Sequence, residues 1–228
     1  MGEPGKRKKK RARLTRTKTA EEIRNTEKAV KMVELVLRDM DSPFGRSEEA
    51  VAREVRKRIR GLGGSPSFSP IVASGRNASF VHHRPGNKIV REDELVIFDL
   101  GARYMGCCSD VTRMHVPGDS EAMALFRHAL KIQKKVIGMV RAGVGLRELH
   151  DAYAKMMKKN GYRVKHLIGH GIGSVVHERV KGSLKPGMII TVEPGIYIER
   201  FGGCRVEDMI LVTDGEPKIL SKSIPLTV

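Results

Sequence analysis

The same order of elements occurs twice along the chain, and this repeat limits the folds that the sequence can adopt. In the first copy, apolar spacing and turn residues predict two amphipathic helices and then three strands, at 19–40, 47–60, 68–73, 94–104 and 110–116. The second copy predicts two more helices and then three strands, at 120–141, 146–159, near 167, 188–199 and 205–213. The two copies share few identical residues, so the repeat is one of pattern. It predicts an α+β fold in which two similar halves face each other.

Each copy ends in a hairpin with an acidic residue on each arm. Asp99 and Asp110 lie in the first hairpin, and Glu193 and Glu207 lie in the second. An ionised carboxylate in an apolar strand is costly unless it is paired or binds a metal. An ion pair or a turn cap usually explains one such acid. Four acids that meet where the halves face each other would repel one another, so a cation is expected between them.

A histidine among glycines supplies a further metal ligand. His170 lies in the segment GHGIG, where the glycines allow the backbone to approach closely. Carboxylates with one imidazole suit Mn, Co, Zn or Fe better than a soft metal bound by thiolates. His177 lies seven residues on, and on an extended strand it would face away from His170 unless a bulge intervenes. Spacing alone therefore favours a structural role for His177.

The other histidines give weaker signals. His82 or His83 could donate a hydrogen bond to a carbonyl, although a surface position is the commoner role for such residues. Ordinary structural or surface roles are expected for the remaining four, which are His115, His128, His150 and His166.

The positive charge of the chain is concentrated at its start. The formal net charge is +17, and residues 1–18 contain nine Lys or Arg and one Glu. We expect a basic, disordered arm over 1–18 and a single domain over 19–228. The arm could bind RNA or the ribosome weakly through phosphate groups, or it could be a solvated tail, and the sequence favours neither. Aromatic residues make up 4% of the chain, which disfavours a surface on which bases stack.

Composition also predicts the compartment. Three cysteines are too few for a disulfide framework and indicate a reducing environment. No apolar run has the length of a membrane span, and no hydrophobic segment follows the basic start. A cytoplasmic protein without membrane contact is expected.

Four segments that carry the acids and His170 resemble the pita-bread metallopeptidases. They read FDLGARYMGCCSDVTR, GHGIGSVVHE, VEPGIYI and RVED. That family contains Xaa-Pro dipeptidases, Xaa-Pro aminopeptidases, methionine aminopeptidases and creatinases. The resemblance covers about residues 19 to 221, and VEPGIYI with LVTDGEPKIL is more similar to the Xaa-Pro branch. It implies a pita-bread fold, in which a curved antiparallel sheet with two pseudo-symmetric halves is flanked by helix pairs.

The resemblance also implies roles for individual residues. Two divalent ions, Mn or Co first and Zn or Fe as alternatives, would be held by five ligands, which are Asp99, Asp110, His170, Glu193 and Glu207. In this scheme Asp110 and Glu207 bridge the ions, and Glu193 also moves a proton. His82 and His177 would contact the scissile amide and the tetrahedral intermediate, which is the opposite of what spacing indicates for His177. Arg205 would orient the bridging acid.

The implied activity is removal of an N-terminal residue from a peptide substrate, ahead of proline. Two alternatives stay open. One is methionine aminopeptidase, and the other is a non-catalytic pita-bread module that binds RNA or ribosomes through the basic arm. Xaa-Pro enzymes carry a separate N-terminal domain, whereas here only the arm precedes the first helix, so we expect a catalytic domain alone, as a monomer or homodimer.

Overall fold

The computed structural model describes residues 13–228 and has an α+β architecture, as predicted. Its four α-helices are α1 (Ala20–Asp39), α2 (Glu48–Gly61), α3 (Ser120–Ile137) and α4 (Leu146–Lys159). The strands of the first half are β1 (Ser65–Pro66), β2 (Ile71–Ser74), β3 (Val96–Leu100), β4 (Ala102–Tyr104), β5 (Cys107–Cys108) and β6 (Val111–His115). The strands of the second half are β7 (Ile189–Val192), β8 (Gly195–Ile198), β9 (Gly202–Arg205), β10 (Asp208–Leu211) and β11 (Lys218–Ile219). A 3₁₀-helix, η1 (Gly75–Ser79), follows β2.

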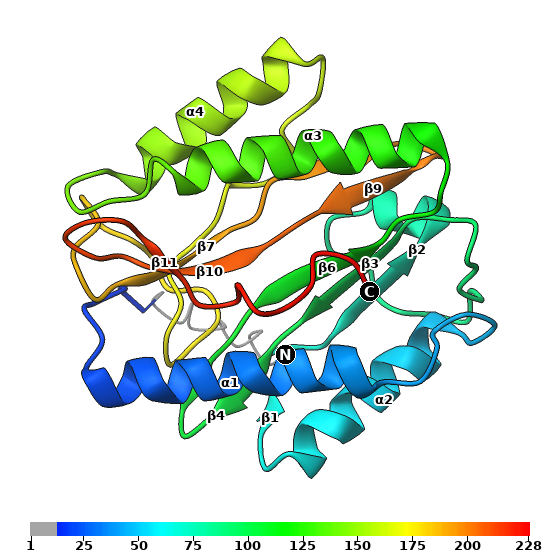
Figure 1. The fold of residues 1–228 in the computed structure, drawn as a ribbon, viewed down its shortest axis with the longest axis horizontal. Coiled ribbons are helices and arrows are strands. Elements are labelled where there is room, and N and C mark those ends of the chain that lie inside the picture. Colours follow the sequence, from blue (N-terminus) through cyan, green and yellow to red (C-terminus); the bar gives the residue numbers. More distant parts are fainter. Residues whose placement is uncertain (1–12) are drawn as a thin grey trace, which may run out of the picture.

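The two helix pairs lie on opposite sides of the strands, α1 with α2 below and α3 with α4 above (Figure 1). A capping box starts α1, because the Thr19 hydroxyl accepts from the Glu22 amide at 3.2 Å and the Glu22 carboxylate accepts from the Thr19 amide at 2.9 Å. Two clusters of buried side chains form the core. Successive residues of β3 contribute to different clusters, since Val96 and Phe98 join the α1–α2 cluster and Ile97 joins the α3–α4 cluster.

Each half contains one long antiparallel hairpin whose pairing breaks at the acidic residues. In the first half, β3 pairs with β6 as far as Leu100 and Val111, and β4 then pairs with β5. Asp110 lies at the break. In the second half, β7 pairs with β10 and β8 pairs with β9, and Glu193 and Glu207 lie between the two ladders. The predicted strand 188–199 is therefore two strands, interrupted at Glu193 and Pro194.

One predicted strand does not form. The segment near Leu167 has no regular ladder among the described residues. It still runs beside β7, because the Glu193 amide donates to the Ile168 carbonyl at 2.8 Å and the Thr191 amide donates to the His170 carbonyl at 2.9 Å. Isolated hydrogen bonds thus place this segment against the second half.

The last part of the basic arm packs against the fold. Residues 1–12 lie outside the described residues, so their predicted disorder stays a prediction. In contrast to the prediction for the whole arm, 13–18 is fixed beside the loop that carries His177. The Thr15 amide donates to the Arg179 carbonyl at 3.0 Å, and Lys18 Nζ lies 2.6 Å from Glu178 Oε2 with both side chains 4% exposed. A cation in this position satisfies a carboxylate that would otherwise be buried alone.

Replacement of Lys18 by Met is expected to lower the free energy of unfolding by about 3–5 kcal/mol, because it leaves the Glu178 carboxylate buried without its cation. The double variant Lys18→Met/Glu178→Gln should recover most of this loss. Urea denaturation would measure both. Arg16→Met is the matched control: Arg16 pairs with Glu22 at the surface with 62% of its side chain exposed, so its loss should cost less than about 1 kcal/mol. Equal costs for the two single variants would contradict the assignment.

Among the helices of residues 13–228, none combines the length and the apolar character needed to cross a membrane.

Candidate metal centre

Four acidic side chains from separate segments line one cavity. Asp99 belongs to β3, Asp110 directly precedes β6, Glu193 connects β7 to β8, and Glu207 connects β9 to β10. The cavity has a volume of about 440 Å³, and His170 also lines it. The fold therefore brings together all five residues that the sequence predicts as metal ligands.

Direct contacts between the two halves hold the acids in place. The Glu207 amide donates to the Thr112 carbonyl at 3.2 Å, and the Thr112 hydroxyl donates to Glu207 Oε2 at 2.8 Å. Thr112 pairs with Asp99 across β3 and β6, so it joins acids of both halves. Thr112 thus links the first hairpin to the second.

Arg205 is the second link between the halves. Its buried guanidinium donates from Nη2 to Asp99 Oδ2 at 2.6 Å and from Nε to the Thr112 hydroxyl at 3.2 Å. Nη1 donates to the Tyr197 hydroxyl at 2.8 Å and to the Val81 carbonyl at 3.1 Å. The planar fork therefore orients an acid of the site and also the backbone next to His82.

The protonation of His170 suits a metal ligand. Its Nδ1 lies 3.1 Å from the Gly171 carbonyl, which can only accept, so Nδ1 carries the hydrogen and Nε2 has the free lone pair. Burial, together with the neighbouring His177, lowers the pKa of His170 to about 4. The segment can approach β7 closely because residue 169 is glycine: a Cβ there would lie 2.0 Å from the Thr191 carbonyl oxygen.

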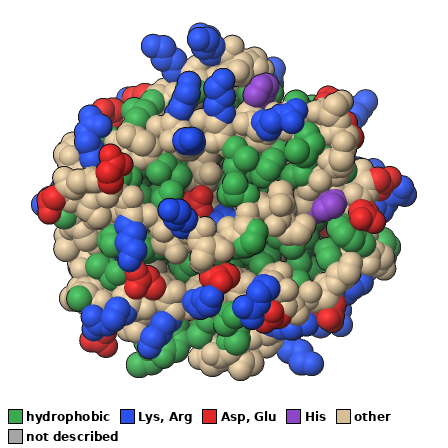
Figure 2. Space-filling model, in the orientation of Figure 1, with side chains coloured by type: hydrophobic (Ala, Val, Ile, Leu, Met, Phe, Trp, Pro, Cys, Tyr) green, Lys and Arg blue, Asp and Glu red, His purple; other side chains and the backbone are tan. Residues whose placement is uncertain are grey.

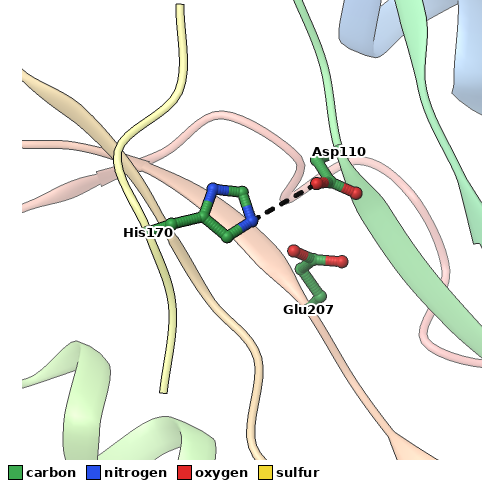
Figure 3. Close-up of side chains that lie close together, drawn as sticks. All are labelled: Asp110, His170 and Glu207. Atoms are coloured by element: carbon green, nitrogen blue, oxygen red, sulfur yellow. Dashed lines mark ion pairs between the residues drawn. The ribbon is translucent and has the colours of Figure 1, made fainter. Parts of the chain in front are cut away.

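The distances between the ligand atoms of these side chains are close to those expected around a shared cation. Figure 3 shows the His170 ring and the Asp110 and Glu207 carboxylates pointing toward one another, and their ligand atoms all lie within 4.8 Å. His170 Nε2 is 3.5 Å from Asp110 Oδ2 and 3.4 Å from Glu193 Oε1. Two ligand atoms that each lie about 2.1 Å from one ion are about 3.0–3.4 Å apart at octahedral or tetrahedral angles.

The charge of the site also fits a divalent ion. Burial raises the pKa of both Asp110 and Glu207 well above the usual range, and the neighbouring carboxylates add to the rise. Burial raises the pKa of Glu193 to about 7. Asp99 Oδ1 is buried and has no hydrogen-bond partner among the described residues. Acids that repel one another, together with an unpaired carboxylate oxygen, form a group that can bind a divalent cation.

Two histidines predicted from the family resemblance also line the cavity. His177 lies beside His170 with 4.2 Å between the ring centroids, so the spacing argument against it was wrong. The physical reason is a reversal of the chain: the amides and carbonyls of Gly171 and Glu178 exchange two hydrogen bonds, at 3.0 and 2.7 Å. An extended strand was therefore the wrong geometry for this segment. His82 lies on another part of the cavity wall.

Sequence reasoning missed His166, which was expected to have only an ordinary structural role. It lines the cavity, and its Nδ1 lies 3.8 Å from Glu193 Oε2. Nδ1 donates to the Leu167 carbonyl at 2.8 Å, so Nε2 accepts from the Tyr197 hydroxyl at 2.9 Å. Its place four residues before His170 was an available signal, because residues i and i+4 share one face of an extended segment.

The sequence pattern described as metallopeptidase family M24 matches residues 19–214. The chain belongs to this family. An Xaa-Pro dipeptidase from Pyrococcus furiosus is 34% identical over 219 residues, which are 90% of this chain and 63% of the relative. The chain thus spans about 63% of the length of that curated M24 relative.

Solved M24 structures confirm the predicted pita-bread fold. A dipeptidase from Pyrococcus horikoshii superposes with a TM-score of 0.87 at 33% identity, covering 92% of this chain and 63% of that one. An X-Pro aminopeptidase from Thermotoga maritima gives a TM-score of 0.85 at 26% identity, with 92% and 63% covered. The curved sheet between two helix pairs is therefore the arrangement found in these proteins.

The stability of the metal-free M24 domain should fall as the pH rises from about 6.5 to 8. The acids have raised pKa values in the folded protein, whereas unfolded carboxyl groups titrate near pH 4. The folded state therefore binds more protons than the unfolded state, and deprotonation favours unfolding. Below about pH 6.5, His166 and His170 oppose this trend, because burial lowers their pKa values to about 4.

Thermal melts in a chelator would show this fall in stability, and added Mn²⁺ should remove most of it. A melting temperature that rises over this range without metal would contradict the prediction.

Proposed function

We propose that this chain is a divalent-metal-dependent exopeptidase that removes the N-terminal residue from peptides in which proline is second. The observation that carries the proposal is the convergence of Asp110, His170 and Glu207 ligand atoms within 4.8 Å in a buried cavity. Asp99 and Glu193 lie on the same cavity wall. The M24 family and the Xaa-Pro names of its relatives support the reaction class.

Two ions, Mn²⁺ or Co²⁺, would be held by Asp99, Asp110, His170, Glu193 and Glu207. Divalent ions in such a centre lower the pKa of water and polarise the substrate carbonyl. Glu193 would also accept and return a proton at its carboxylate, because it lines the same cavity as the other ligands.

The cavity wall also suits the substrate. His82 and His177 line the cavity, and their rings would donate to the scissile amide and to the oxygen that gains charge. Apolar side chains cover much of the rest of the wall, namely Phe68, Ile71, Val81, Leu167 and Val176. A pyrrolidine ring offers an apolar surface of a size that such a wall can cover.

The test is a substrate series with purified full-length chain loaded with Mn²⁺ or Co²⁺. We expect turnover of Ala-Pro and of Ala-Pro-Ala, and at least about tenfold slower release of methionine from Met-Ala-Ser. Faster release of methionine would favour a methionine aminopeptidase instead. No turnover of any peptide, with two ions bound per chain by elemental analysis, would overturn the peptidase proposal.

A further inference from the structure

The second helix pair carries far more positive charge than the first. Residues 120–165, which contain α3 and α4, have eleven Lys or Arg and three Asp or Glu, a formal charge of +8. Residues 20–61, which contain α1 and α2, have ten Lys or Arg and nine Asp or Glu, a charge of +1. Both pairs cover equivalent halves of the same fold, so the fold itself does not require the difference.

The charges of the second pair are exposed and almost unpaired. All eleven basic side chains of 120–165 are exposed. In this stretch the described residues form a single ion pair, between Arg147 and Asp151, at 3.9 Å and with both side chains more than half exposed. Residues 20–61, which contain the first helix pair, instead form several ion pairs, such as Lys31 with Glu34 and Arg46 with Glu54. Five of the ten basic residues of 20–61 thus form an ion pair within the chain, whereas only one of the eleven of 120–165 does so among the described residues.

The basic side chains form one surface across both helices. Arg127, Lys131 and Lys135 follow at intervals of four residues, which places them along one face of α3. A cavity of about 150 Å³ lies between α3 and α4, with Lys131, Lys135 and Lys159 around it. In Figure 2, blue side chains predominate over the part of the molecule where Figure 1 shows α3 and α4.

Stabilisation of the helices explains only part of this charge. Lysines in the last turn interact favourably with the helix dipole, which accounts for Lys134 and Lys135 in α3 and for Lys158 and Lys159 in α4. Arg127, Lys131 and Lys155 lie outside the last turns, as do the basic residues in the connecting loops.

The side chains exposed on the α3–α4 face indicate which class of polyanion it can bind. Between residues 120 and 165 the one large hydrophobic side chain that is exposed is that of Val164, at 37%, and a single valine is too small an apolar surface to anchor the face in a lipid membrane. Phe126 and Tyr153 are buried, and Tyr162 is only partly exposed, with its hydroxyl 2.7 Å from His128 Nδ1, so the face presents no row of exposed aromatic rings on which unpaired bases could stack. Exposed lysines and arginines without aromatic partners suit the regular phosphate rows of a duplex.

We propose that the α3–α4 face binds the phosphate backbone of double-stranded nucleic acid without reading its sequence. None of the basic residues of 120–165 lines the metal cavity, so the proposal does not depend on the peptidase activity.

The experiment measures binding of a labelled 20-base-pair duplex, as RNA and as DNA, to the full chain by fluorescence anisotropy at several salt concentrations. The test variant is Arg127→Glu/Lys131→Glu/Lys155→Glu. The matched control is Arg24→Glu/Arg53→Glu/Lys57→Glu, which makes the same charge change at exposed positions of α1 and α2. Circular dichroism verifies that both fold, and a Gln version of the test variant serves if the Glu version does not.

We expect the test variant to weaken duplex binding at least about tenfold and to reduce the slope of log Kd against log salt by about 2–3. The control should lose less than about threefold in affinity. Whichever duplex binds more tightly, RNA or DNA, is the kind of nucleic acid that this face binds. Equal losses in the two variants, no duplex binding by the full chain at 50 mM salt, or tighter binding to phosphatidylserine vesicles or polyglutamate would each overturn the proposal.

Discussion

Asp110→Asn is expected to reduce metal binding and peptide hydrolysis by more than about 100-fold while making the metal-free protein more stable. Substitution of groups that only orient metal ligands already costs about 10–100-fold, so loss of a ligand should cost more. The stability gain has a separate cause: burial and the nearby Glu207 raise the pKa of Asp110 well above its usual range, so its ionised form opposes folding. A neutral amide of the same shape removes that opposition.

Elemental analysis, turnover of Ala-Pro and thermal melts in a chelator would measure the three effects. A difference of one in pKa corresponds to about 1.4 kcal/mol, and each kcal/mol moves the melting temperature of a protein of this size by about 2–4 °C. Asp214→Asn is the matched control, because Asp214 is exposed and does not line the cavity. Retained metal and full activity in Asp110→Asn would refute its assignment as a ligand.

Arg205→Met is expected to lower the free energy of unfolding by about 3–5 kcal/mol and to slow hydrolysis by about 10–100-fold. The substitution leaves Asp99 Oδ2 without its cation, and Oδ1 of the same carboxylate already has no hydrogen-bond partner among the described residues. It also releases the Val81 carbonyl beside His82. Both the acid and the histidine would then lose their fixed positions.

Two further variants separate the charge of Arg205 from its shape. Arg205→Lys keeps the charge but cannot contact Asp99, Thr112 and Tyr197 together, so it should recover less than half of the lost stability. Asp99→Asn in the Arg205→Met background should restore stability but not hydrolysis, which a double-mutant cycle would show. Arg24→Met, on the surface of α1, should change neither quantity.

The architecture could be predicted because its signals are local. Helix periodicity and the Thr19–Glu22 capping box predict α1 at nearly the observed bounds. The repeated order of elements predicts two halves that meet, and this is the observed arrangement. The prediction was wrong where pairing is irregular: Pro194 and the acids interrupt the 188–199 strand, and the segment near Leu167 is held by single hydrogen bonds. Propensity and periodicity do not report on such long-range contacts.

The residues of the candidate site could likewise be predicted only in part from the sequence. The acids stand out because carboxylates are rare in apolar strands, and His170 stands out among its glycines. The only local signal for His166 is its spacing from His170, and its contacts with Tyr197 and Glu193 join residues that are distant in sequence. The contact of Lys18 with Glu178 joins residues 160 positions apart, so no local pattern could show that the basic arm is partly fixed.

By itself, the sequence determined the two-halved α+β fold, the five residues expected to bind metal and the unequal charge of its segments, because these depend on residue type and spacing. Only the tertiary structure decided how the halves join through Thr112 and Arg205, that the chain reversal at Gly171 turns His177 toward His170, and that the charge of residues 120–165 forms one exposed face. The physical reason is that burial, hydrogen bonding and ion pairing are set by neighbours in space, and those neighbours come from distant parts of the chain.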